Sequence, residues 1–136
     1  MKIDKLFNGL KRIANGDYVL EGDLISEETI EIDLDDRFVV KGKIWAKKSI
    51  VVRCGIEAGD GIEAGDGIKA GWGIKAGCGI EAGAFISVKK RIFAGISIYR
   101  TSKDCDKTIR CTELRDGEVC YGDLILTGSE EKPDED

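Results

Sequence analysis

The stretch GIEAGDGIEAGDGIKAGWGIKAGCGIEAG, residues 55–83, repeats one short pattern with little variation. Isoleucine recurs at every sixth position, and an alanine follows two residues after each isoleucine. Flexible glycine-rich linkers keep no fixed period, so this regularity predicts a structural repeat. The frame extends outward with other apolar residues and covers residues 31–96 as eleven hexads. The outer apolar pairs are Ile32/Leu34, Phe38/Val40, Ile44/Ala46, Ile50/Val52, Ile86/Val88 and Ile92/Ala94.

Each hexad predicts a very short β-strand with one buried face. Two apolar residues separated by one residue point to the same side of a strand. Glycines in the first and fifth slots of the hexad predict corners with positive φ angles, which glycine adopts at low cost. Three hexads would then close a triangular coil. The predicted fold is an all-β, single-stranded parallel β-solenoid, a three-sided β-helix with about 18 residues per coil.

We expect the flanks to cap the open ends of this solenoid, because bare strand edges invite pairing with other chains. Residues 1–17 place apolar side chains at helical spacing ahead of a glycine stop, which predicts an amphipathic N-terminal helix. Its apolar stripe consists of Ile3, Leu6, Phe7, Leu10 and Ile13. Residues 18–100 are expected to form the solenoid, 101–128 a C-terminal cap of short strands, and 129–136 an acidic tail.

Charge and hydropathy restrict the expected environment and partners. The chain has 21 basic and 26 acidic residues and a net charge of −5. A negative protein repels a phosphate backbone unless its basic residues cluster on one surface, so we expect no direct nucleic-acid binding. The sequence contains neither a long apolar run nor the layout of a signal peptide, which favours a cytoplasmic protein without membrane contact.

The absence of histidine from the sequence argues against most hydrolytic and transfer chemistry. A histidine base, a Ser-His or Cys-His pair and a histidine-bearing zinc site are all excluded. Asp60 and Asp66 fall on different sides of the predicted triangle, so they should not share a metal ion. We therefore expect a protein that is not an enzyme, with no catalytic residue, cofactor or metal.

Five cysteines in a chain without a secretion signal favour free thiols over disulfides. Cys105, Cys111 and Cys120 could offer three thiolates to zinc. However, the CxxC spacing typical of zinc knuckles is missing, and no fourth ligand is evident. Buried structural thiols are the favoured interpretation.

The hexad period resembles two known families. Hexapeptide-repeat acyltransferases follow the pattern [LIV]-[GAED]-x-x-[STAV]-x, but here the alanine follows the isoleucine, and no histidine is present to activate an acceptor. No catalytic residue can therefore be transferred from that family. Residues 31–98 also resemble bactofilin-type cytoskeletal β-helices, which implies end-to-end polymerisation. The GIxAG strings are similar as well to those of small bacterial and phage proteins.

The outward third slot of each hexad predicts three surface ladders. One of them reads Trp45, Glu63, Glu81 and Tyr99, and the others read Asp33, Val51, Lys69, Ser87 and Val39, Glu57, Lys75, Phe93. Two stacked carboxylates destabilise a sheet, so folding alone does not require Glu63 beside Glu81. Trp72, at a corner between two glycines, should project into solvent. Either caps cover these aromatic residues, or Trp45, Glu63, Glu81, Tyr99 and Trp72 bind a partner.

These features favour a non-catalytic protein-binding module. Small phage-encoded inhibitors of bacterial defence complexes, including anti-CRISPR proteins, work in this way, and an acidic surface suits a partner that handles nucleic acid. The sequence is also compatible with a homodimer. The alternatives are a bactofilin-like polymer-forming structural protein and, less favoured without histidine, a hexapeptide-type acyltransferase.

Overall fold

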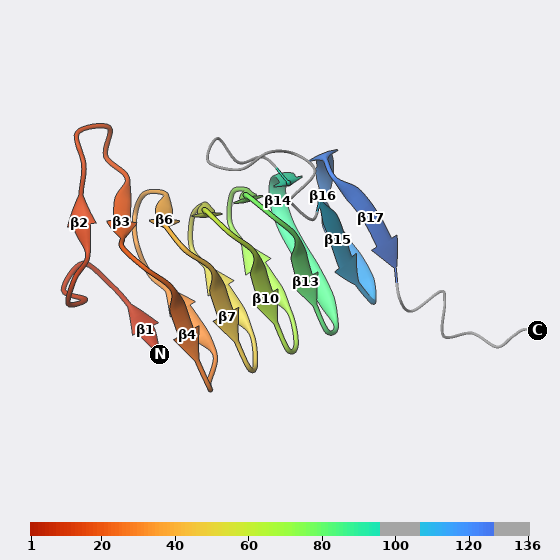
Figure 1. The fold of residues 1–136 in the computed structure, drawn as a ribbon, viewed down its shortest axis with the longest axis horizontal. Helices are drawn as coiled ribbons and strands as arrows, with labels where there is room; N and C mark the ends of the chain where they lie inside the picture. Colours follow the sequence, from red (N-terminus) through yellow and green to blue (C-terminus); the bar gives the residue numbers. More distant parts are fainter. Residues whose placement is uncertain (96–106, 127–136) are drawn as a thin grey trace, which may run out of the picture.

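The fold is a parallel β-solenoid of about five coils of about 18 residues each, in agreement with the predicted architecture. This computed structural model describes residues 1–95 and 107–126, and every helix or strand element in these ranges is a β-strand. Figure 1 shows the chain advancing along one axis, from β1 at the N-terminal end to β17 at the C-terminal end.

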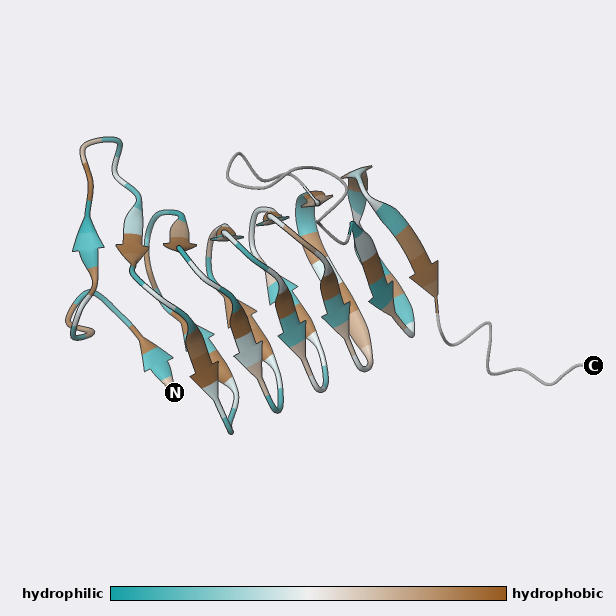
Figure 2. Cartoon of the chain, in the orientation of Figure 1, coloured by the Kyte–Doolittle hydropathy of each residue, from teal (hydrophilic) through white to brown (hydrophobic). Residues whose placement is uncertain are grey.

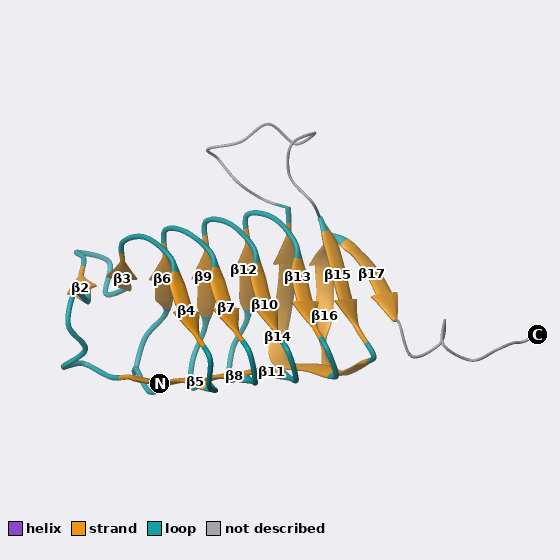
Figure 3. Cartoon of the chain, turned by 60° about the horizontal axis from the view of Figure 1, so that its bottom comes forward, coloured by secondary structure: helices purple, strands orange, loops and turns teal. Residues whose placement is uncertain are grey.

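The strands stack on three faces, which Figure 3 shows from below (β4 to β17 in front, β5 to β11 along the bottom). The first face contains β1 (Lys2–Ile3), β5 (Ile30–Ile32), β8 (Ile50–Val52), β11 (Ile68–Ala70) and the start of β14 (Phe85–Ala94). The second face contains β2 (Lys11–Arg12), β3 (Tyr18–Leu20), β6 (Phe38–Val40), β9 (Ile56–Ala58), β12 (Ile74–Ala76) and the end of β14. The third face contains β4 (Leu24–Ser26), β7 (Ile44–Ala46), β10 (Ile62–Ala64), β13 (Ile80–Ala82), β15 (Thr108–Cys111) and β17 (Asp123–Leu126). β16 (Glu113–Tyr121) pairs with β14 along its length, and only the β2–β3 pair among the described strands is antiparallel.

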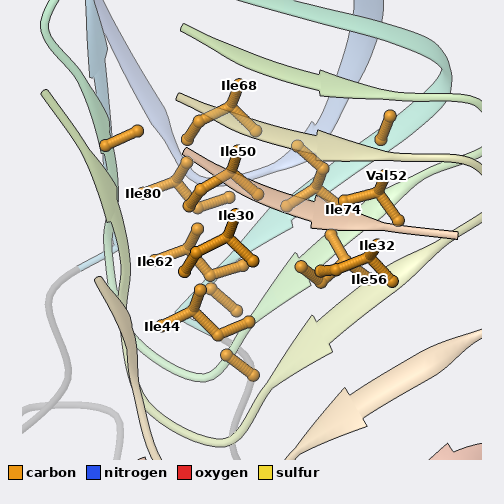
Figure 4. Packing of buried hydrophobic residues seen from close by; sticks show 14 of the residues in the cluster. Ile30, Ile32, Ile44, Ile50, Val52, Ile56, Ile62, Ile68, Ile74 and Ile80 are labelled. Atoms are coloured by element: carbon orange, nitrogen blue, oxygen red, sulfur yellow. The ribbon is translucent and has the colours of Figure 1, made fainter. Parts of the chain in front are cut away.

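The core consists of ladders of apolar residues, many of them isoleucine stacked on isoleucine. Ile68 stacks between Ile50 and Ile86, one coil before and one coil after it. The repeat isoleucines at positions 56, 62, 68, 74 and 80 are at most 1% exposed. Figure 4 shows these side chains packed inside the solenoid, and Figure 2 shows hydrophobic segments recurring from coil to coil. Burying each isoleucine stabilises the fold by roughly 1.5–3 kcal/mol, so the repeat supplies its own core.

The predicted N-terminal helix is wrong. Ile3 is fully buried in β1, which extends the first face beside β5, and β2 forms a hairpin with β3. Leu6 is 91% exposed and Ile13 is 46% exposed, so the expected apolar stripe does not lie on one packed surface.

Two local causes explain why these residues form turns and strands. Gly9 and Gly16 adopt φ angles of 89° and 96°, which interrupt a right-handed helix. The Leu6 amide donates to the Asp4 carboxylate at 3.0 Å and so closes a local turn. A short isolated helix is marginal in water, whereas the free edge of the first coil offers backbone partners. The amides of Glu31 and Asp33 donate to the carbonyls of Met1 and Ile3, both at 2.8 Å.

The hexad frame also shifts at its upstream end. We expected Ile32 and Leu34 to occupy one strand, but the strand is Ile30–Ile32, and it pairs with Ile50–Val52. The interval from Ile30 to Ile50 is 20 residues, whereas the interval from Ile50 to Ile68 is 18. The two additional residues lie in the corner between β5 and β6, where Leu34 is 1% exposed and adds to the core.

The repeat glycines are required for a different reason from the predicted one. The described glycines with positive φ are Gly9, Gly16, Gly22, Gly95, Gly117 and Gly122, and all lie outside residues 55–83. Coils instead approach closely at the corners: a Cβ atom on Gly65 would overlap the carbonyl oxygen of Lys47. The amides of Gly65 and Asp66 donate to Ala46 and Lys48 of the previous coil at 3.0 and 2.8 Å. At Gly59, Gly65, Gly71 and Gly83 the corners are therefore close, hydrogen-bonded contacts without room for a side chain.

Candidate binding surfaces

The outward ladder of the third face contains three of the predicted binding residues. Trp45 pairs with Glu63, and Glu63 pairs with Glu81, each in parallel register. Tyr99 lies outside the described residues, and Arg110 on β15 is the neighbour of Glu81. The structure therefore places a cation at one end of the carboxylate pair and an indole at the other.

Arg110 could not be assigned to this ladder from the repeat. The interval from Ile80 to its partner Ile109 is 29 residues, so the hexad count no longer applies after β14. The only signal was the short alternation of Thr108–Cys111, in which Ile109 and Cys111 are buried and Arg110 is exposed. This pattern predicts a strand with Arg110 facing outward, but not which strand it joins.

An open depression of about 300 Å³ lies over the third-face ladder. Its lining includes Trp45, Glu63, Glu81, Thr108 and Arg110. It combines an apolar indole with carboxylates and one guanidinium, so it suits a cationic side chain that also needs apolar contact.

Trp72 lies on a separate surface from Trp45, at the corner between the first and second faces. It is 50% exposed. Its amide donates to the Cys54 carbonyl at 3.0 Å, and its own carbonyl accepts from the Lys90 amide at 2.8 Å, so the backbone below the indole is fixed between two coils. The predicted binding residues therefore do not form one site.

A second depression, of about 410 Å³, lies beside Trp72. Its lining includes Arg37, Trp72, Lys75, Lys90, Arg91 and Phe93. The guanidinium of Arg37 contacts the carboxylates of Asp17 at 2.7 Å and Glu57 at 3.6 Å. The hydrogen bond to Asp17 raises the pKa of Arg37, which fixes a charged side chain at one end of the depression.

Acidic residues in the corner between β5 and β6 hold the N-terminal segment in place. Lys2, Lys5 and Arg12 form ion pairs with Asp33, Asp35 and Asp36 at 3.9, 3.4 and 3.7 Å. The Tyr18 hydroxyl donates to Asp35 at 2.8 Å. This hydrogen bond raises the pKa of Tyr18 and lowers the pKa of Asp35. These charged side chains stabilise the fold, because each one pairs with an oppositely charged side chain of the same protein.

No disulfide joins the described cysteines. Cys54, Cys78 and Cys111 are buried and Cys120 is exposed, while Cys105 lies outside the described residues. Burial raises the pKa of the Cys54 and Cys111 thiols, which keeps them protonated and unreactive. Residues 1–95 and 107–126 contain no cluster of three or more histidine, cysteine or acidic residues suited to a metal ion. The same residues include no helix long and apolar enough to cross a membrane.

The ends of the third face are unpaired strand edges. Within the described ranges, β4 pairs only with β7, and β17 pairs only with β15. Leu124 stacks on the buried Ile109, so it continues a core ladder, yet it is 38% exposed. This end therefore presents core-type side chains to solvent.

No family model, curated protein or solved structure matches the chain. The structure itself shows a parallel β-solenoid with short strands.

Proposed function

We propose that this protein is a non-catalytic protein-binding module that engages a basic surface of its partner through the third face. The observation that carries the proposal is the direct pairing of Glu63 with Glu81 beside Trp45. Like charges opposite one another weaken a sheet, and an outward indole adds little to the core. A partner with arginine or lysine side chains would offset the repulsion and cover the indole.

The rigidity of the solenoid supports this role. The ladder residues lie on strands that are hydrogen-bonded to strands on both sides, and backbone bonds also join the corners of successive coils. A preformed surface loses little conformational entropy on binding, so a modest number of contacts can give useful affinity.

More narrowly, we propose that the protein inhibits a nucleic-acid-handling defence complex, as anti-CRISPR proteins do. Such complexes hold phosphates with arginine and lysine, and carboxylates stacked at about 4.8 Å, the strand spacing, can pair with the same groups. The open depression at Trp45 and Arg110 adds a contact that is not purely electrostatic.

The double variant Glu63→Lys/Glu81→Lys should lose the partner while keeping the fold. We expect partner affinity to fall about tenfold or more, because two attractive charges become repulsive. The thermal midpoint should fall only slightly, because both side chains are exposed. The small loss comes from the new positive charge at position 81, which faces Arg110 instead of pairing with it. Crosslinked capture followed by mass spectrometry, compared across variants, measures the loss.

Glu31→Lys is the matched control, because Glu31 is exposed in the outward ladder of the first face and undergoes the same charge change. It should retain the captured protein. Equal capture by the wild type, the double variant and Glu31→Lys would contradict the assignment of the third face.

A bactofilin-like polymer is the second candidate, and the outer edge of β17, with which no other described strand pairs, favours it. The expected helical cap is absent, and among the described strands the opposite edge strand β4 pairs only with β7. A second copy stacked on β17 would bury Leu124 and continue the ladders.

If the ends do stack, Leu124→Lys should abolish concentration-dependent assembly, because it places a charge between coils. Light scattering and negative-stain electron microscopy of the wild type at increasing concentration provide the measurement. Ile125→Lys, on the outward ladder of the same strand beside Arg110, is the control and should still assemble. A wild type that stays a discrete species at all concentrations would remove the polymer candidate.

A further inference from the structure

We infer that the corner between the first and second faces binds single-stranded nucleic acid. This basic corner consists of Trp72, Lys75, Lys89, Lys90, Arg91 and Phe93, contributed by β12, β14 and the turn before β12. It is separate from the third face, so the inference does not depend on the proposed protein contact.

The cations of the basic corner are not neutralised within the described chain. Ion pairs hold Lys2, Lys5, Arg12, Arg37, Lys47, Lys48, Arg53 and Arg115, but none involves Lys75, Lys89, Lys90 or Arg91. Two carboxylates are register neighbours: Glu57 beside Lys75 and Glu118 beside Arg91. Glu57 already contacts Arg37 at 3.6 Å, so the corner keeps an excess of positive charge.

This clustering changes what the overall charge implies. A net charge of −5 argues against nucleic-acid binding only if the basic residues are dispersed. Lys89, Lys90 and Arg91 are consecutive and all exposed where β14 crosses from one face to the next. Four cations on one edge of the solenoid form the kind of local positive field that attracts phosphates.

The aromatic side chains point to bases as the second component of the ligand. Trp72 is 50% exposed, and Phe93, which pairs with Lys75, is half-buried beside it in the 410 Å³ depression. Gly55 and Gly73 also line this depression, so part of its wall is bare backbone that a flat group can approach. Indole and phenyl rings beside cations are the recurrent features of single-strand binding grooves.

A single strand fits this combination better than the other polyanions. Duplex DNA hides the faces of its bases, so the exposed indole would find no stacking partner. An acidic peptide would satisfy the lysines and Arg91 but supplies no planar group for Trp72. A single strand offers phosphates for the cations and a base face for the indole.

Fluorescence anisotropy with a labelled oligothymidylate of about 12 nucleotides tests the inference at low salt. We expect saturable binding whose affinity falls as salt rises, with a slope of about −0.7 per phosphate contacted. Trp72→Ala should weaken binding about tenfold or more through lost stacking. Lys90→Glu should weaken binding and also make the salt dependence shallower. Circular dichroism should show both variants folded, because neither residue is in the core.

Lys41→Glu is the matched control, because Lys41 is an exposed lysine after β6 that lies outside the basic corner. It should change the affinity less than twofold. Absence of saturable binding at low salt would overturn the inference, as would equal affinity for a duplex of the same length. Tighter binding of a polyglutamate peptide, unaffected by Trp72→Ala, would also overturn it and identify an acidic protein segment as the ligand.

Discussion

Replacing Ile68 with aspartate should unfold the protein. Ile68 is fully buried and lies in the middle of a core ladder between Ile50 and Ile86. The substitution removes a buried apolar side chain and places a carboxylate among aliphatic groups with no partner. We expect a loss of about 4 kcal/mol or more in the free energy of unfolding, a large part of the stability of a typical domain. Urea denaturation followed by circular dichroism measures it.

The adjacent residue provides the control for this change. Lys69 is on the same strand but faces outward, so Lys69→Asp introduces the same carboxylate without burial. It should melt within a few degrees of the wild type. A folded Ile68→Asp variant, or equal effects at the two positions, would contradict the alternating inward and outward pattern on which the solenoid depends.

Gly65→Ala should produce the second-largest loss of stability, although it adds one methyl group. That methyl would overlap the carbonyl oxygen of Lys47, and both coils are fixed at this corner by backbone hydrogen bonds. Relief requires the coils to separate, which weakens the ladders on either side. We expect a cost of about 3 kcal/mol, at the upper end of what overpacking usually causes. Thermal and urea unfolding report this cost.

Gly55→Ala distinguishes close approach from a general intolerance of alanine at corners. A Cβ atom on Gly55 would lie 3.6 Å from the nearest atom, the carbonyl oxygen of Gly73, which is an ordinary contact. Its φ angle is not in the left-handed region, so the variant should unfold within about 1 kcal/mol of the wild type. Similar losses for Gly55→Ala and Gly65→Ala would show that conformational preference, not space, selects glycine.

The sequence predicts the solenoid well because the same local rule recurs in every hexad. Ile56 and Ala58 are separated by one residue, and six residues later the pattern starts again, which leaves few alternatives to a stacked coil. Side-chain alternation is a property of the strand itself, so it can be read without knowing the neighbours.

The ends of the fold are harder to predict because other coils determine them. Ile3 suits a helix stripe and an edge strand equally well, and only the free edge of β5 decides between them. Ile30, Ile32 and Leu34 alternate without interruption, so the sequence does not reveal where the strand stops and the longer corner begins.

The candidate surfaces were only partly predictable for the same reason. Counting by 18 places Glu63 beside Glu81, but it does not bring Arg110 to the end of the same ladder. The outward ladders of third slots do not contain the corner slots, which hold Trp72, Lys89, Lys90 and Arg91. Trp72 and Lys90 become neighbours only when one coil is stacked on the next.

The near identity of the hexads leaves the central coils without a register of their own. A slip by one hexad within residues 55–83 would still place isoleucine on isoleucine and alanine on alanine, so these slots barely distinguish the native alignment from a shifted one. The landmarks lie on either side: the 20-residue interval before Ile50, and Phe85, whose ring packs over Gly67. The irregular coils on either side therefore fix the register in which the nearly identical central coils stack.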